Sequence, residues 1–256
     1  MNIAIIDKLL LIFFHGLQSY FSLAGQTIVR LFRRPFYYRE FAIQFDKLGF
    51  SSLFICILTG LFTGMVMALQ ALIQLKPFAA TSYVGGMVAA TMIKELGPVL
   101  ASLMVAGRVG SAITAELGTM VVTEQVDAMR VEGTDIIKRL VAPRLKAMLL
   151  AMPLLTVVAD AISIVGGYIM SSGYGISPTM YIKGIPQFMV FQDLIEGLAK
   201  PAFFGVVIAL TGCYVGLNTR GGAEGVGNAA KRAVVMSSVI ILVSDFFISK
   251  IFVAFR

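Results

Sequence analysis

Long runs of residues without a charge constrain this chain to a membrane. Gly49–Leu75 contains 27 consecutive uncharged residues, enough for a tilted helix to cross a hydrocarbon core of about 30 Å. Similar runs recur toward the C-terminal end, and 14% of all residues are charged against 58% hydrophobic. Soluble domains carry roughly 25% charged residues. The sequence therefore predicts an integral membrane protein.

Five runs are predicted to span the membrane as helices of one all-α domain. Their approximate bounds are 49–75, 80–107, 147–172, 201–217 and 233–255. The second span carries Lys94 and Glu95 inside it, and Pro77–Gly107 as a single helix would be about 46 Å long. Either this helix protrudes from the membrane, or Gly97-Pro98 breaks it.

The segment before the first span, about residues 8–40, mixes apolar and polar residues and has a basic end that includes Arg33 and Arg34. We expect a helix that lies in the membrane interface rather than a sixth span. A charged pair precedes the apolar run Leu9–Phe14, and no small-residue cleavage pattern follows it. We therefore expect no cleaved signal peptide.

Lys and Arg are divided unevenly between the connecting segments. Fifteen lie in the N-terminal region, the 108–146 loop and a Gly-rich loop at 218–232, and five lie on the opposite side. Cytoplasmic segments carry the excess of Lys and Arg, which places the N-terminus in the cytoplasm and the C-terminus outside. We interpret 173–200 as a loop with one short helix. The basic residues flank apolar runs, which argues against nucleic-acid binding.

Residues 111–129 are predicted to form an amphipathic helix on the cytoplasmic side, after a turn at Gly107–Gly110. Its apolar face comprises Ile113, Leu117, Met120, Val121 and Ala128, and its polar face comprises Glu116, Thr119, Thr123 and Asp127. Glu124 projects near the apolar face and would need a partner. Helices that rest on headgroups usually carry Lys and Arg, whereas this polar face is acidic. We therefore favour docking on a protein partner with basic residues.

Four charges inside the predicted spans could carry function. Lys94 and Glu95 form either a polar patch in a substrate cavity or a boundary pair that snorkels to water. Asp160 and Asp245 are each either a proton site or the structural partner of a basic residue such as Lys200 or Arg232. The sequence leaves these alternatives open.

Several other chemistries lack the residues they need. His15 is the one histidine, so a His-based metal site or catalytic triad has no second member. Cys56 and Cys213 lie in apolar runs and are expected to be small buried hydrophobes. The Gly-rich loop has Asn228 where a P-loop needs Lys. If ATP drives this protein, another chain binds it.

Short motifs across most of the chain match a known family. They are Glu95-Leu96-Gly97-Pro98, Ala106-Gly107-Arg108, Gly110-Ser111-Ala112, Thr114-Ala115-Glu116, Thr123-Glu124-Gln125, Ala142-Pro143-Arg144, Pro153-Leu154-Leu155-Thr156, Gly166-Gly167 and Asp245-Phe246. From about Gly49 to its C-terminus the chain resembles the MlaE family, also called YrbE, the ABC-type lipid permeases of the Mla system. In the first 40 residues, only the general character of the sequence resembles the family, and no specific motif matches.

The resemblance implies a homodimeric permease in the bacterial inner membrane, with five spans, an N-terminal interfacial helix and a cytoplasmic coupling helix at Ser111–Met129. It implies a separate cytoplasmic ABC ATPase that holds ATP and magnesium, a periplasmic MCE-domain lipid-binding protein and often a STAS-domain protein. The cargo would be glycerophospholipid moved between the inner and outer membranes. The residues implied in ATPase coupling are Arg108, Glu116, Thr119, Thr123, Glu124 and Asp127.

In the family, lipid sits at the dimer interface near the periplasmic ends of the first two spans. Carried over by position, the implied lipid-binding residues are Met67, Gln70, Leu75, Phe78, Lys94, Glu95 and Leu96, with Lys200 and Arg232 as basic positions near the cavity. Lys94 stands where the family leads us to expect Arg, so the charge is kept but bidentate phosphate recognition is lost. Asp160 matches no family position.

Three other functions compete with a lipid permease. A proton-coupled secondary transporter would use Asp160 or Asp245, and inverted repeats would support it, but the sequence has none that we find. A membrane anchor that only recruits a cytoplasmic partner leaves the intramembrane charges without a role. An intramembrane enzyme is the least supported, because one His and scattered acids assemble no nucleophile–base pair.

Overall fold

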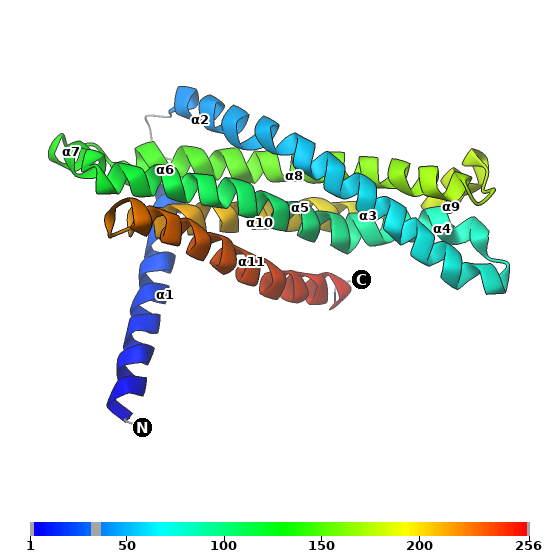
Figure 1. Cartoon of the computed structure of the whole chain (residues 1–256), viewed down its shortest axis with the longest axis horizontal. Coiled ribbons are helices and arrows are strands. Elements are labelled where there is room, and N and C mark those ends of the chain that lie inside the picture. Colours follow the sequence, from blue (N-terminus) through cyan, green and yellow to red (C-terminus); the bar gives the residue numbers. More distant parts are fainter. Residues whose placement is uncertain (1–2, 32–36, 255–256) are drawn as a thin grey trace.

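The structure is a computed structural model, and it describes residues 3–31 and 37–254, which contain helices and no strands. Figure 1 shows long helices side by side in an elongated bundle, with helix α1 (Ile3–Leu31) crossing one end of it. The remaining α-helices are α2 (Tyr38–Phe45), α3 (Ser51–Leu75), α4 (Val84–Thr91), α5 (Gly97–Val105), α6 (Ser111–Val122), α7 (Gln125–Val131), α8 (Ala142–Ser172), α9 (Pro178–Phe188), α10 (Phe191–Leu217) and α11 (Gly222–Ala254).

Five continuous helical stretches in the described part of the chain are long and apolar enough to cross a membrane. They are Tyr38–Phe78, Thr81–Val122, Ile137–Ser172, Phe191–Leu217 and Gly222–Ala254. Several combine α-helices with short π-helical segments. The prediction of an all-α membrane protein with five spanning helices is confirmed.

Helix α1 lies against the end of the bundle and does not run along it (Figure 1). The Tyr20 hydroxyl is 3.2 Å from the Thr211 hydroxyl, and the Tyr214 hydroxyl donates to the Gly16 carbonyl at 3.2 Å. Both contacts attach α1 to the C-terminal part of α10. This placement agrees with an interfacial helix, while Arg33, Arg34 and the rest of residues 32–36 lie outside the described residues.

The second span is one helix from Thr81 to Val122, about 60 Å long. Of the two alternatives for this span, the structure supports a helix that protrudes from the membrane, and Gly97-Pro98 does not break it. Gly97-Pro98 follows a π-helical segment, Met92–Leu96. The predicted turn at Gly107–Gly110 is wrong, because Ala106–Gly110 is π-helical and leads directly into α6. Glycines mark a turn only where the backbone leaves the helical region, and here it does not.

Two predicted loops are largely helical. Most of 173–200 forms α9 and the start of α10, and most of 218–232 forms the start of α11. The charged residues in the first turns of α10 are paired inside the bundle, which allows this helix to begin at Phe191. The start of α11 is held by Ala229 and Ala233, which are fully buried beside Val215.

Glycines allow the spanning helices to approach one another closely. A Cβ at Gly60 of α3 would lie 2.5 Å from the Ala159 carbonyl oxygen of α8, and one at Gly64 would overlap the Ser163 carbonyl oxygen. The GxxxG pair therefore brings two backbones into contact. Gly212 and Gly216 of α10 have the same role against α6.

Among the described residues, two apolar cores fill most of the bundle, in addition to the small cluster of Val215, Ala229 and Ala233. The larger lies among α3, α5, α6, α8 and α10 and includes both cysteines, which are fully buried as expected. The smaller lies around Val84, Val88 and Tyr181, at the end of the bundle that carries α9. The Tyr181 hydroxyl donates to the Ile164 carbonyl at 3.2 Å. Burial raises the pKa of Tyr181 to about 12, so the hydroxyl stays protonated as a donor.

Candidate functional site

Charged side chains from three spanning helices meet inside the bundle. This charged cluster consists of Lys94 and Glu95, between α4 and α5, Asp193, Glu196 and Lys200 of α10, and Asp245 of α11. Lys200 and Asp245 each lie about 14 Å along their helix from its nearest end. The charged cluster is therefore within the spanning region, where unpaired charge is costly.

Lys200 is the centre of the charged cluster, and its side chain has no exposed surface. Its ammonium lies 2.9 Å from Glu95 Oε2, 2.9 Å from Glu196 Oε1 and 3.5 Å from Asp245 Oδ1. A single lysine thus joins carboxylates from three helices. The sequence left open whether Asp245 is a proton site or the structural partner of a basic residue. Its ion pair with Lys200 supports the structural role.

Lys200 also compensates for a proline. Pro98 has no backbone N–H, so it cannot bond the carbonyl of Lys94, four residues earlier, as an α-helix requires. The Lys200 ammonium donates to that Lys94 carbonyl at 2.8 Å. The bend-prone Gly97-Pro98 segment is therefore tied to α10 by a charged donor.

The edge of the charged cluster differs from its centre. Lys94 Nζ lies 2.9 Å from Asp193 Oδ2, and Asp193 is 3% exposed. The Glu95 side chain, by contrast, is 43% exposed, and Ser249 Oγ donates to it at 3.1 Å. A carboxylate facing hydrocarbon is unfavourable, so this edge calls for water or a protein partner.

The uncharged residues implied in lipid binding separate into two groups. Met67, Leu75 and Leu96 are half-buried against the smaller core. Gln70 and Phe78 are exposed, Phe78 by 79%. The structure thus brings three of the five together beside the end of the second span.

Arg232 lies apart from the other implied residues. It is exposed on α11, about 20 Å along the helix from Asp245. Within this chain Arg232 is not at the charged cluster, and the α11 residue that meets Lys200 is Asp245.

Asp160 is buried in α8 without a basic partner among the described residues. It is 7% exposed, and its Oδ1 has no hydrogen bond. A Cβ at Gly97 would overlap this oxygen, so the carboxyl group sits against the Gly97-Pro98 backbone. Neither Lys200 nor Arg232 pairs with it.

The predicted single helix at 111–129 is two helices. Thr123 and Glu124 separate α6 from α7, and Glu124 has a φ of 59°. Because the helix ends here, Glu124 is exposed and does not lie near the apolar face as expected. Ile113 and Leu117 of that face are fully buried, whereas Ala128 is exposed.

The residues implied in ATPase coupling have different environments. Glu116 lies between Lys47 at 3.0 Å and the buried Arg144 at 3.1 Å, so its carboxylate bridges α6 to other parts of the bundle. The others are exposed: Arg108, Thr119, Thr123, Glu124 and Asp127. Asp127 pairs with Arg130 of the same helix at 2.8 Å.

Sequence reasoning missed several partners. Glu196 stands four residues before Lys200, a spacing that pairs side chains on one helix face, and it could have been found. Asp193, Ser249, Lys47 and Arg144 contact residues far away in the sequence. No local signal identifies such pairs.

Comparisons with known proteins decide the class of this site. The family model described as Permease MlaE matches residues 41–251. The chain belongs to the MlaE permease family. The match includes all six residues of the charged cluster and both α6 and α7, and it leaves out α1.

Individual relatives of this chain support the same family assignment. A probable ABC transporter permease protein of Rickettsia bellii is 42% identical over 238 residues, covering 93% of this chain and 91% of the relative. One from Synechocystis sp. is 39% identical over 239 residues, with coverage of 93% and 91%. The intermembrane phospholipid transport system permease protein MlaE of Haemophilus influenzae is 33% identical over 210 residues, with coverage of 81% and 80%. The chain is a multi-pass membrane permease, a class of protein that is not itself an enzyme.

Proposed function

We propose that this chain is the permease subunit of an ABC-type transporter that moves glycerophospholipids between the inner and outer membranes, driven by a separate ATPase. The observation that carries this is the MlaE family match over residues 41–251, joined by a relative named as a phospholipid transport permease. The sequence has no P-loop, so we assign ATP and magnesium to the partner ATPase.

The lipid path is assigned to the half of the second span that begins at Thr81. Half-buried Met67, Leu75 and Leu96 offer an apolar wall for acyl chains. Lys94 and Lys200 are already paired with carboxylates, so their role is to hold the helices around this wall. Glu95, with its exposed carboxylate, forms the polar edge of the cavity, and Gln70 and Phe78 flank its mouth.

A second copy of the chain is assigned to the face beside Glu95. The apolar part of α11 is only 11% buried within one chain, and Phe246 and Phe247 are both more than half exposed on it. An apolar face next to a part-exposed carboxylate suits a homodimer that encloses a cavity. Arg232 lies on the cytoplasmic half of this face, so any contact that it makes with lipid would be there.

The exposed surface of α6 and α7 is assigned to the cytoplasmic ATPase. Glu124 and Asp127 project from it, which suits a partner with basic residues. The family resemblance adds a periplasmic MCE-domain protein and a STAS-domain protein on the ATPase. The excess of basic residues supports an orientation with the N-terminus in the cytoplasm and the C-terminus in the periplasm of a bacterial inner membrane.

One observation favours a proton-coupled secondary transporter as the second candidate. Asp160 is a buried carboxyl group without a hydrogen bond to Oδ1, which is a feature of proton sites in membranes. The ion pair of Asp245 with Lys200 gives that residue a structural role instead.

Co-purification tests the proposed function. The chain is expressed with the products of its neighbouring genes, and the complex is assayed for ATP hydrolysis and for phospholipid by mass spectrometry. We expect an ATPase subunit and glycerophospholipid in the same complex. Absence of an ATPase, with proton-linked uptake by this chain alone, would overturn the proposal in favour of the second candidate.

A further inference from the structure

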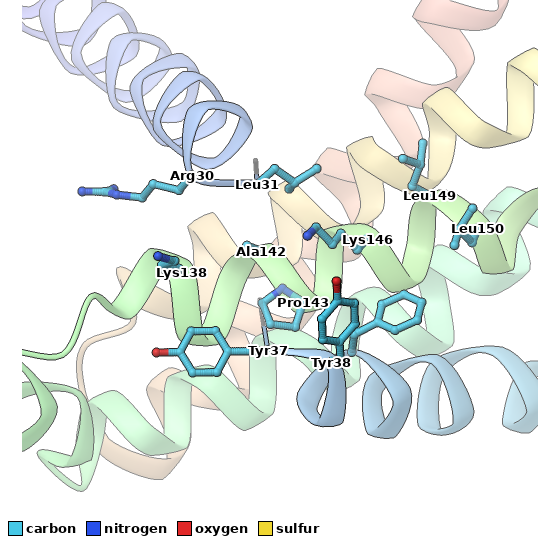
Figure 2. Close-up of a pocket in the computed structure, with 11 residues that line it drawn as sticks. Arg30, Leu31, Tyr37, Tyr38, Lys138, Ala142, Pro143, Lys146, Leu149 and Leu150 are labelled. Atoms are coloured by element: carbon cyan, nitrogen blue, oxygen red, sulfur yellow. The ribbon is translucent and has the colours of Figure 1, made fainter. Parts of the chain in front are cut away.

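Two cavities lie near helix α2, at the end of the bundle opposite α9 (Figure 1). One, of about 260 Å³, lies between the end of α1, the start of α2 and the first turns of α8 (Figure 2). Its lysines, Lys138 and Lys146, each already interact with another group of the protein, so their charges are not available to a ligand. The other is a cleft of about 590 Å³ between the start of α3 and α6, and two of its charged groups have no such partner.

Four charged residues line this α3–α6 cleft: Asp46, Lys47, Arg108 and Glu116. Lys47 and Glu116 are paired with each other, with Nζ 3.0 Å from Oε2. Asp46 and Arg108 are exposed, and among the described residues neither side chain has an ion pair or a hydrogen bond. The cleft therefore presents one unpaired carboxylate and one unpaired guanidinium.

The sequence positions of these two charges place the cleft at the boundary of the membrane. Asp46 lies two residues before the uncharged run 48–75, and Arg108 ends the uncharged run 96–107. Both runs belong to spanning helices, so the cleft lies where headgroups meet hydrocarbon. Each of the two residues is part of a π-helical segment, a feature that is frequent at functional sites.

A row of exposed apolar side chains leads from the cleft toward the membrane interior. Phe50 lines the cleft, and Phe54, Leu58 and Phe62 follow at a spacing of four residues, which places them on one helix face. All four are between 44% and 74% exposed, and the row is about 18 Å long. Two opposite charges followed by an apolar row match a phospholipid whose headgroup carries both a phosphate and an amine.

From this arrangement we propose that the α3–α6 cleft binds the headgroup of one amine-bearing glycerophospholipid of the cytoplasmic leaflet. The Arg108 guanidinium contacts the phosphate, for which its planar fork of donors is suited. The Asp46 carboxylate accepts a hydrogen bond from the ammonium group, and the acyl chains run along Phe50 and Phe54. The lipid path assigned above lies in the other half of the second span, and this inference rests on the proposed function only for the leaflet.

The two charges predict a choice among headgroups. The quaternary ammonium of phosphatidylcholine has no hydrogen to donate to Asp46, and phosphatidylglycerol has no cation for it. Phosphatidylethanolamine satisfies both Asp46 and Arg108. The cleft should therefore prefer phosphatidylethanolamine to the other two lipids.

The chain has no tryptophan, so a single introduced tryptophan reports on the lipid beside it. Phe54→Trp places the reporter on the apolar row, and Leu154→Trp, at a 58% exposed position of α8, is the control. The two positions have similar depth, because Gly60 of α3 lies against Ala159 of α8. The full-length protein is placed in phosphatidylcholine nanodiscs with a minor fraction of phosphatidylethanolamine or phosphatidylglycerol. Bromine is carried on the acyl chains of one lipid at a time, and fluorescence quenching is measured.

We expect phosphatidylethanolamine to be enriched over phosphatidylcholine by roughly fivefold at the Phe54→Trp reporter, the equivalent of about one hydrogen bond, and not at Leu154→Trp. Phosphatidylglycerol should not be enriched at either reporter. Asp46→Asn or Arg108→Gln should each abolish the enrichment without lowering the midpoint of thermal unfolding, because both side chains are exposed. Asp46→Glu should retain it.

Equal enrichment at both reporters, enrichment that survives Asp46→Asn, or a preference for phosphatidylglycerol would overturn the site. A Phe54→Trp reporter that no lipid quenches would also overturn it, because a second copy of the chain would then cover this face. The readout needs neither ATPase nor transport, so a negative result leaves the proposed function intact.

Discussion

The ammonium of Lys200 lies 2.8 Å from the carbonyl oxygen of Lys94, more than a hundred residues earlier in the chain. That carbonyl is the one deprived of an α-helical donor by Pro98. The same ammonium contacts Glu95, Glu196 and Asp245. One buried lysine thus repairs an irregular helix and neutralises charge from three helices within the membrane.

Lys200→Met should destabilise the protein by about 3–5 kcal/mol, because it leaves buried carboxylates without their cation. The measurement is the midpoint of thermal unfolding in detergent, with Lys250→Met at an exposed position of α11 as control. Neutralising Glu95, Glu196 and Asp245 together in the Lys200→Met background should restore much of the loss. An unchanged midpoint for Lys200→Met alone would show that the charged cluster does not hold the helices.

Gly64→Ala should cost about 1–3 kcal/mol, because its methyl group meets the Ser163 carbonyl of α8 and forces the two helices apart. Gly107→Ala is the matched control, since nothing lies within 4 Å of a Cβ there. The comparison uses the same unfolding assay. If both alanines behave alike, the close approach of α3 and α8 is not what requires glycine.

Glu124→Lys with Asp127→Lys should reduce recovery of the ATPase in a pull-down by on the order of tenfold or more, because like charges would then meet across the interface. Both side chains are exposed, so the fold should be unaffected. Glu224→Lys, exposed at the start of α11, is the control. Glu116 is unsuitable for this test, since its ion pairs with Lys47 and Arg144 make it part of the fold. Full recovery with the double variant would place the ATPase elsewhere.

Asp160→Asn should leave ATP-driven lipid transport intact and should not lower thermal stability. The carboxyl group has no cation to lose, and the amide keeps its shape while removing the cost of burying a charge. Transport and unfolding are measured on the same preparation. Loss of transport with a normal unfolding midpoint would support the proton-coupled alternative.

The sequence predicted the spanning helices because uncharged runs of this length are rare outside membranes. It failed where polar residues are paired across the bundle. Asp193 and Lys200 lie in the segment 173–200 that we interpreted as a loop with one short helix, yet their partners in other helices allow α10 to begin at Phe191. Gly107 and Gly110 suggested a turn, whereas their backbone stays helical.

The functional residues divide in the same way. Lys94 and Glu95 were recognised because charge is rare in a spanning helix, and the exposed positions Thr119 and Thr123 follow from helical spacing. The break at Glu124 depends on one residue with positive φ, for which the sequence held no turn signal such as glycine. The internal role of Glu116 depends on Arg144, which is adjacent only in the folded chain.

The most direct test of the central claim is lipid movement by the purified complex. The permease and its ATPase are reconstituted in vesicles with a labelled glycerophospholipid, and its exchange with acceptor vesicles or a lipid-binding partner is followed. We predict exchange that requires ATP and is unaffected by collapsing a proton gradient. The claim would be contradicted if the permease alone exchanged lipid at a rate that is independent of ATP and depends on the proton gradient.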